Sequence, residues 1–138
     1  MIEDENGLVG CGSSPRYIAA ILDNFIGILL AVSLGSVASK SAEVLRGSLG
    51  LLGYFGYFFL LEGAFGRTVA KLLLGLVVMR TDGTRAGWRE AAQRTLLRVL
   101  EVNPVLLGAL PAALFVAFSK KHQRLGDMWA GTVVVQTT

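Results

Sequence analysis

Two long apolar runs dominate the pattern of hydrophobic and polar positions along this chain. The first, residues 15–39, opens on a proline and holds only Arg16, Asp23 and Asn24 as strongly polar members. The second covers residues 47–65 and follows a short polar turn. Because a helix of about 20 apolar residues crosses the roughly 30 Å hydrocarbon core of a bilayer, both runs predict membrane-spanning helices.

Small residues recur at helical spacing in both runs. Gly27, Ala31 and Gly35 fall at every fourth position of the first run, and four glycines between residues 47 and 56 fall at every third position of the second. In a bilayer, small residues let two helices approach closely. The two spans are therefore expected to pack against each other through these faces.

The segment 66–101 is rich in arginine and lysine and therefore predicts a cytoplasmic location by the positive-inside rule. Its apolar stretch 71–79 is too short to span, and Asp82-Gly83 marks a turn after it. A helix is expected next, with its basic and apolar residues on opposite faces. Such a basic amphipathic helix suits the membrane interface, with anionic headgroups as partners of the 66–101 segment. Its apolar face would hold Trp88, Ala91, Ala92, Thr95, Leu96 and Val99, and its polar face Arg89, Glu90, Gln93, Arg94 and Arg98.

The third apolar run, residues 102–119, is interrupted by Asn103, Pro104, Gly108 and Pro111. It could cross the membrane, or residues 86–119 could enter and return as a helical hairpin. The hairpin places 11 basic residues on one side and 2 on the other, against 8 and 5 for a full crossing, so we favour the hairpin. It also brings the strand-like runs 76–79 and 132–135 to one side, where they could form a short β pair.

Composition supports an all-α membrane protein with this one β pair. Hydrophobic residues make up 53% of the 138 residues and charged residues 17%, against about 25% in an ordinary soluble domain. Residues 1–14 are acidic and rich in glycine and serine, so we expect a disordered lead before a single membrane domain at 15–138. The net charge of +3 comes from basic residues beside apolar runs, which favours a bilayer over nucleic acid.

Enzymatic chemistry is not expected. A single cysteine, Cys11, and a single histidine, His122, cannot supply a disulfide framework or a Cys/His metal site. His122 lies in a polar, basic run, and the chain has no phosphate-binding loop. We therefore predict no cofactor and no metal.

Three acidic residues lie in or beside apolar segments: Asp23, Glu62 and Asp127. A charge there costs roughly 3 kcal/mol on insertion scales, so each needs a partner, a water-filled cavity or a proton. Arg16 precedes Asp23 by two helical turns, about 10 Å along the axis, which is long for a direct ion pair. Asp127, brought from the tail, could bridge toward Arg16.

Two interpretations of these residues stay open. Arg16, Asp23 and Asp127 could form a proton or cation relay, or a structural clamp that holds the tail to the first helix. Glu62, Arg67 and Lys71 are secondary candidates, with Glu62 expected to pair with Arg67.

The same residues resemble the RDD family of small bacterial membrane proteins. The likeness runs in order through Arg16 and Asp23, the segment 66–78 with Asp82-Gly83, Arg94, Arg124-Leu125-Gly126-Asp127 and the segment 130–135. The one arginine and two aspartates that name the family match Arg16, Asp23 and Asp127. Ala70 departs from the family's usual glycine, and Gly126 from a usual histidine, which removes a titratable group beside Asp127.

The resemblance implies a multi-pass protein of the bacterial cytoplasmic membrane and leaves two function classes open. Some members are proposed to exchange sodium or other monovalent cations for protons, and others are modules attached to larger proteins. As an exchanger the chain would be oligomeric, because two spans enclose no pore. Asp23 and Asp127 would then be the ion or proton sites, and Arg16 would control them. As a non-enzymatic accessory or scaffold subunit it would dock on a larger membrane complex.

Overall fold

A computed structural model of the chain describes residues 2–3, 9–101, 118 and 124–137. The predicted third run, 102–119, therefore lies almost wholly outside the described residues. Within them the structure is mostly helical, with a small antiparallel sheet. The elements in chain order are β1 (Ile2–Glu3), β2 (Val9–Gly10), α1 (Ser13–Val37), α2 (Glu43–Phe65), α3 (Val69–Leu73), β3 (Leu76–Arg80), α4 (Trp88–Glu101), α6 (Leu125–Ala130) and β4 (Thr132–Gln136).

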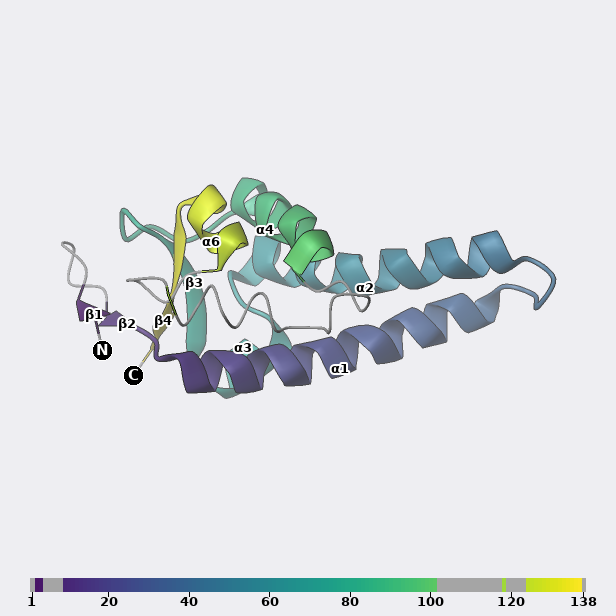
Figure 1. The fold of residues 1–138 in the computed structure, drawn as a ribbon, viewed down its shortest axis with the longest axis horizontal. Coiled ribbons are helices and arrows are strands. Elements are labelled where there is room, and N and C mark those ends of the chain that lie inside the picture. Colours follow the sequence, from purple (N-terminus) through teal and green to yellow (C-terminus); the bar gives the residue numbers. More distant parts are fainter. Residues whose placement is uncertain (1, 4–8, 102–117, 119–123, 138) are drawn as a thin grey trace.

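Helices α1 and α2 form a long antiparallel hairpin that extends away from the rest of the molecule (Figure 1). With 25 and 23 residues, both are long and apolar enough to cross a membrane. At 1.5 Å per residue, α1 measures about 37 Å. Both helices begin earlier than the apolar runs, and Glu43 in the first turn of α2 is favourably placed against the positive end of that helix's dipole.

The predicted glycine faces are confirmed in part. A Cβ atom at Gly50 would lie 3.2 Å from the carbonyl oxygen of Ala31, and one at Gly53 would lie 3.2 Å from a carbonyl oxygen of α1. Backbone therefore meets backbone at these positions, as small residues allow. A Cβ at Gly47 or Gly56 would meet nothing within 4 Å. The glycine stripe of α2 is thus used inside the hairpin at only some of its positions.

The sheet lies at the end of the hairpin where α1 begins and α2 ends (Figure 1). Its strand order is β1-β2-β4-β3, and β3 pairs with β4 antiparallel, with Val77 opposite Val135 and Val78 opposite Val134. This confirms the predicted β pair. The turn after β3 is also as predicted, since Gly83 has φ +83° and the Asp82 carboxylate accepts the N–H of Thr84 at 2.8 Å.

Regular structure extends into the N-terminal segment for which we expected none. The short strands β1 and β2 pair with each other, and β2 pairs with β4 through Gly10 and Val135. The N–H of Cys11 then donates to the carbonyl oxygen of Val134 at 3.1 Å. These strands form because β4 pairs with β3 along one edge only. The backbone N–H and C=O groups on its other edge are buried and need hydrogen-bond partners, which the N-terminal segment supplies.

Helix α4 has the predicted amphipathic character, but the expected orientation of its faces was wrong. Glu90, Arg94 and Arg98 are buried, whereas Leu96 is 63% and Val99 50% exposed. The polar groups of this helix gain by facing other charged groups inside the molecule, and the apolar residues Leu96 and Val99 are left on the outside. Arg94 and Arg98 are therefore not available to lipid headgroups.

Candidate functional site: a buried ion cluster

Charged side chains from five helices meet where the hairpin contacts the short helices. Each is at most 8% exposed, and together we call them the buried ion cluster. Since isolated buried charges are strongly unfavourable, their pairing decides whether this arrangement is stable. The cluster consists of Arg16 and Asp23 on α1, Glu62 on α2, Lys71 on α3, Arg94 and Arg98 on α4, and Asp127 on α6.

Asp127 joins three elements through its carboxylate. It forms salt bridges with Arg16 of α1 and Arg94 of α4, and it accepts the backbone N–H of Arg124 at 3.2 Å. Burial by itself would raise its pKa, but the nearby charges of Arg94, Arg16 and Arg124 outweigh burial and lower the pKa to about 2. Asp127 is therefore ionised at neutral pH. The predicted approach of Asp127 to Arg16 is confirmed.

Glu62 is the second hub of the cluster. It accepts a hydrogen bond from Arg94 Nε at 2.8 Å, forms a salt bridge with Lys71, and lies 4.0 Å from Arg98 Nη2. The expected pairing with Arg67 is wrong, because Lys71 and Arg94 occupy the carboxylate instead. Burial lowers the pKa of Lys71 to about 8, although the charge of Glu62 partly opposes this shift.

Asp23 is held by hydrogen bonds rather than by an arginine. Its carboxylate accepts the hydroxyl of Tyr57 at 2.7 Å, the hydroxyl of Thr68, and the backbone N–H of Ala70 at 3.2 Å. These donors come from α2 and from the start of α3. Asp23 therefore fastens α1 to both elements, and no salt bridge joins it to Arg16 among the described residues.

Two further contacts complete the cluster. Arg94 Nη1 donates to the hydroxyl of Thr132 at 3.0 Å, so the same guanidinium also reaches β4. The Arg98 guanidinium carbon lies 3.5 Å from the centre of the Phe58 ring, a cation–π contact. Sequence reasoning did not place Arg94 or Arg98 in the site. Their spacing of four residues on the polar face of a helix beside an apolar run was the available signal.

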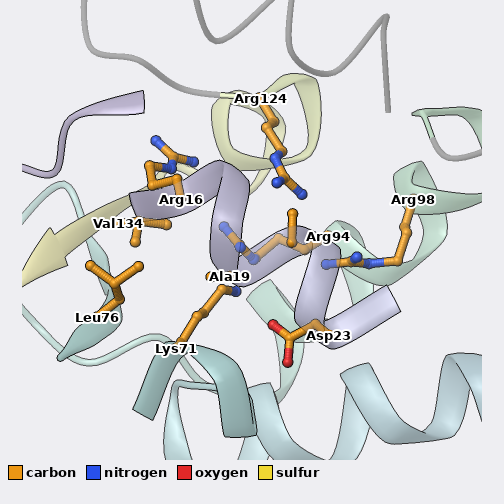
Figure 2. Close-up of a pocket in the computed structure, with 10 residues that line it drawn as sticks. Arg16, Ala19, Asp23, Lys71, Leu76, Arg94, Arg98, Arg124 and Val134 are labelled. Atoms are coloured by element: carbon orange, nitrogen blue, oxygen red, sulfur yellow. The ribbon is translucent and has the colours of Figure 1, made fainter. Parts of the chain in front are cut away.

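A small cavity lies inside this arrangement, bordered by α1, α3, α4, the start of α6 and the strands β3 and β4 (Figure 2). About 10 Å³ is open within it, roughly the room for one water molecule. Among the residues that the structure describes, no group of three His, Cys, Asp or Glu side chains is placed to hold a metal ion. The charged side chains that line the cavity are Arg16, Asp23, Lys71, Arg94, Arg98 and Arg124.

Comparison with known proteins agrees with the likeness noted in the sequence. Neither the curated proteins nor the solved structures include a significant match to this chain. The family model described as the RDD family matches residues 12–131, a span that includes Arg16, Asp23 and Asp127. With most of its length covered by that match, the chain belongs to the RDD family.

Proposed function

We propose that the chain is a non-enzymatic accessory or scaffold subunit of a larger assembly in the bacterial cytoplasmic membrane, with the buried ion cluster as its structural clamp. One observation carries this proposal. Each of the three cluster carboxylates, Asp23, Glu62 and Asp127, is already engaged by donors of the same chain. Carboxylates whose hydrogen-bond donors lie on other helices hold those helices together.

The charge of the cluster also argues against a cation site. Sodium and similar cations bind where oxygen ligands and negative charge are in excess. Here every cluster carboxylate faces donors, and Arg94 contacts both Glu62 and Asp127. The cavity is lined by five cationic side chains and by one carboxylate, that of Asp23, which already accepts hydrogen bonds from Tyr57 and Ala70.

The proposed topology places the N-terminus and the 66–101 segment in the cytoplasm. Lys40 and Arg46 beside the turn between α1 and α2 would lie on the other side. Arg89 is exposed and Arg67 partly exposed, so both remain available to anionic headgroups. The exposed apolar surfaces of α1 and α2 would face lipid or a partner, which includes a second copy of the chain.

The test is reconstitution of the full chain into proteoliposomes with a pH-sensitive dye. We expect no proton flux on addition of sodium, potassium or lithium, either from the wild type or from Asp23→Asn. In membranes solubilised with mild detergent, the wild type should migrate in an assembly larger than one chain in its micelle. Asp23→Asn should reduce that assembly, whereas the matched control Asp82→Asn, in an exposed turn, should retain it. A wild type that migrates as a single chain would contradict the proposal.

A monovalent cation/proton exchanger is the second candidate, and one observation favours it. Asp23 borders the cavity together with Lys71, whose pKa of about 8 allows it to titrate near physiological pH. Cation-dependent proton flux in the wild type, lost in a folded Asp23→Asn variant, would establish exchange and refute the scaffold proposal.

A further inference from the structure

Helix α3 lies beside the hairpin and not beyond its end (Figure 1). Helix α2 ends directly before Gly66, whose φ of +66° changes the direction of the chain. The backbone N–H of Val69 then donates to the hydroxyl of Tyr57 at 3.3 Å, and that of Ala70 to the carboxylate of Asp23 at 3.2 Å. Tyr57 lies about 12 Å before the end of α2 at 1.5 Å per residue. The chain therefore turns back along the two long helices at α3.

The contact with Asp23 gives the level of α3 along α1. Asp23 lies about 15 Å along the helix axis from Ser13, where α1 begins. If α1, at about 37 Å, crosses a hydrocarbon core of roughly 30 Å, at most about 7 Å of it stands outside the core at that end. Asp23 and Ala70 would then lie about 8 Å or more inside the core.

The outward side chains of α3 suit that level. Val69 is 40%, Leu72 55% and Leu73 75% exposed. On the other side of the helix, Ala70 and Lys71 are buried. A helix with its branched apolar side chains outside and its charged side chain inside has the reverse of the order expected in water.

The sheet and its turn, which follow α3 along the chain, have the order expected in water. Val78 and Val134 are at most 2% exposed, whereas Asp82, Thr84 and Gln136 are exposed. The outward surface thus changes from apolar on α3 to polar on the turn and the end of β4. Such a change within one molecule is expected where a membrane surface crosses it.

The start of α3 also meets the main requirement for backbone at membrane depth. The first N–H groups of a helix have no acceptor within the helix, and a hydrocarbon core offers them no water. Here the acceptors for Val69 and Ala70 are the hydroxyl of Tyr57 and the carboxylate of Asp23. Both acceptors belong to the long helices, so the protein itself satisfies these two N–H groups.

Arginines lie at the end of α2, next to the point where the chain turns back. Arg85 is exposed and donates to the carbonyl oxygen of Ala64, in the last turn of α2, at 2.5 Å. Arg67, partly exposed, comes two residues after the end of that helix. Arginines beside an apolar surface are suited to anionic lipid headgroups.

We propose that α3 is a re-entrant helix whose outward face, formed by Val69, Leu72 and Leu73, contacts the acyl chains just below the headgroups of the cytoplasmic leaflet. Arg67 and Arg85 lie at the level of those headgroups. The inference rests on the proposed crossing of the membrane by α1 and α2. It refines that topology, because α3 dips below the membrane surface while the sheet stays in water.

Nitroxide labels on single cysteines measure the level of α3 in proteoliposomes of phosphatidylethanolamine and phosphatidylglycerol. The labelled variants are Leu73→Cys on α3, Leu51→Cys in α2 and Thr84→Cys in the exposed turn, each of the full chain with Cys11→Ala. Power-saturation EPR compares collisions of each label with oxygen, which concentrates in lipid, and with a water-soluble nickel chelate. We expect the ratio of oxygen to nickel collisions at Leu73 to be several times that at Thr84 and below that at Leu51, which lies about 21 Å before the end of α2.

The pattern of the three labels separates failure of this inference from failure of the proposed membrane crossing. A lipid-exposed label at Leu51 with a water-exposed label at Leu73 would refute the re-entrant helix alone. Water exposure at both positions would refute the crossing and, with it, the inference. A label at Leu73 that neither reagent reaches would show that protein, such as a second copy of the chain, covers this face instead of lipid. Leu72→Cys, on the same face, gives the same test if Leu73→Cys does not fold.

Discussion

Replacing Asp127 by asparagine tests the clamp at the residue that joins most elements. Asp127 is 1% exposed and connects α6 to Arg16 of α1 and Arg94 of α4. The substitution keeps the size of the side chain and one oxygen acceptor but removes the negative charge. Arg16 and Arg94 then remain buried with one carboxylate fewer.

The expected loss of stability follows from the ion pairs. Lowering the pKa of Asp127 from 3.8 to about 2 corresponds to about 2 kcal/mol of preference for the ionised form. Removing one partner of a buried ion pair costs about 3–5 kcal/mol, because the remaining charge is left uncompensated. Since asparagine retains an acceptor, we expect Asp127→Asn to lower the free energy of unfolding by about 3 kcal/mol.

The assay is reversible unfolding in detergent, arranged as a double-mutant cycle of Asp127→Asn with Arg16→Gln. The two losses should not add, because Arg16 without its carboxylate already lacks its partner. Asp82→Asn, in an exposed turn, is the control and should unfold like the wild type. A loss below about 1 kcal/mol for Asp127→Asn, or strictly additive losses, would refute the clamp.

Asp127→Asn should also change how the free energy of unfolding depends on pH, in a direction that the pKa of Asp127 fixes. The folded pKa of Asp127 lies below its ordinary value of 3.8, so its stabilising contribution is fully present above that value. The contribution is lost as the pH falls through about 2. Asp127→Asn should lack this acid-dependent component of unfolding, and a variant that retains it would assign the component to another carboxylate.

Three further predictions test other parts of the arrangement. Gly50→Leu should lower stability by about 1–3 kcal/mol in detergent unfolding because its side chain meets the backbone of α1, whereas Gly47→Leu should not. Tyr57→Phe should lower it by about 1–3 kcal/mol, because the carboxylate of Asp23 loses one donor. In the wild type, stability should rise between pH 8 and 10.5, because the folded state releases the Lys71 proton before the unfolded state does. Lys71→Met should lack that rise; its persistence would exclude Lys71 as the source.

The two long apolar helices and the β pair could be predicted because each leaves a long or repetitive pattern. Apolar runs of membrane-spanning length and two β-branched runs are visible without any knowledge of tertiary contacts. The contact between Arg16 and Asp127 could also be inferred, since a charge in an apolar segment requires a partner. In each of these cases the local sequence pattern by itself indicates the structure or the contact that forms.

The orientation of α4 and the partners of Asp23 could not be predicted, for different physical reasons. Helical periodicity separates the face of Arg94 from that of Leu96, but it does not say which of the two faces packs inward. Asp23 is fixed by α3, a helix of 5 residues that is too short to leave a periodic signal. The N-terminal strands have 2 residues each and leave none either.

The position of Asp127 near the end of the chain also has a consequence for biogenesis. Arg16, Glu62 and Arg94 are synthesised and can enter the membrane before the carboxylate that joins Arg16 to Arg94 leaves the ribosome. During that interval the nascent hairpin must keep Arg16 hydrated or near headgroups, since its partner does not yet exist. The ion pairs of Asp127 with Arg16 and Arg94 therefore form late, only after nearly the whole chain has been synthesised. Products that stop before residue 127 should lack the carboxylate that joins Arg16 to Arg94, a feature by which quality-control proteases could distinguish them from the finished protein.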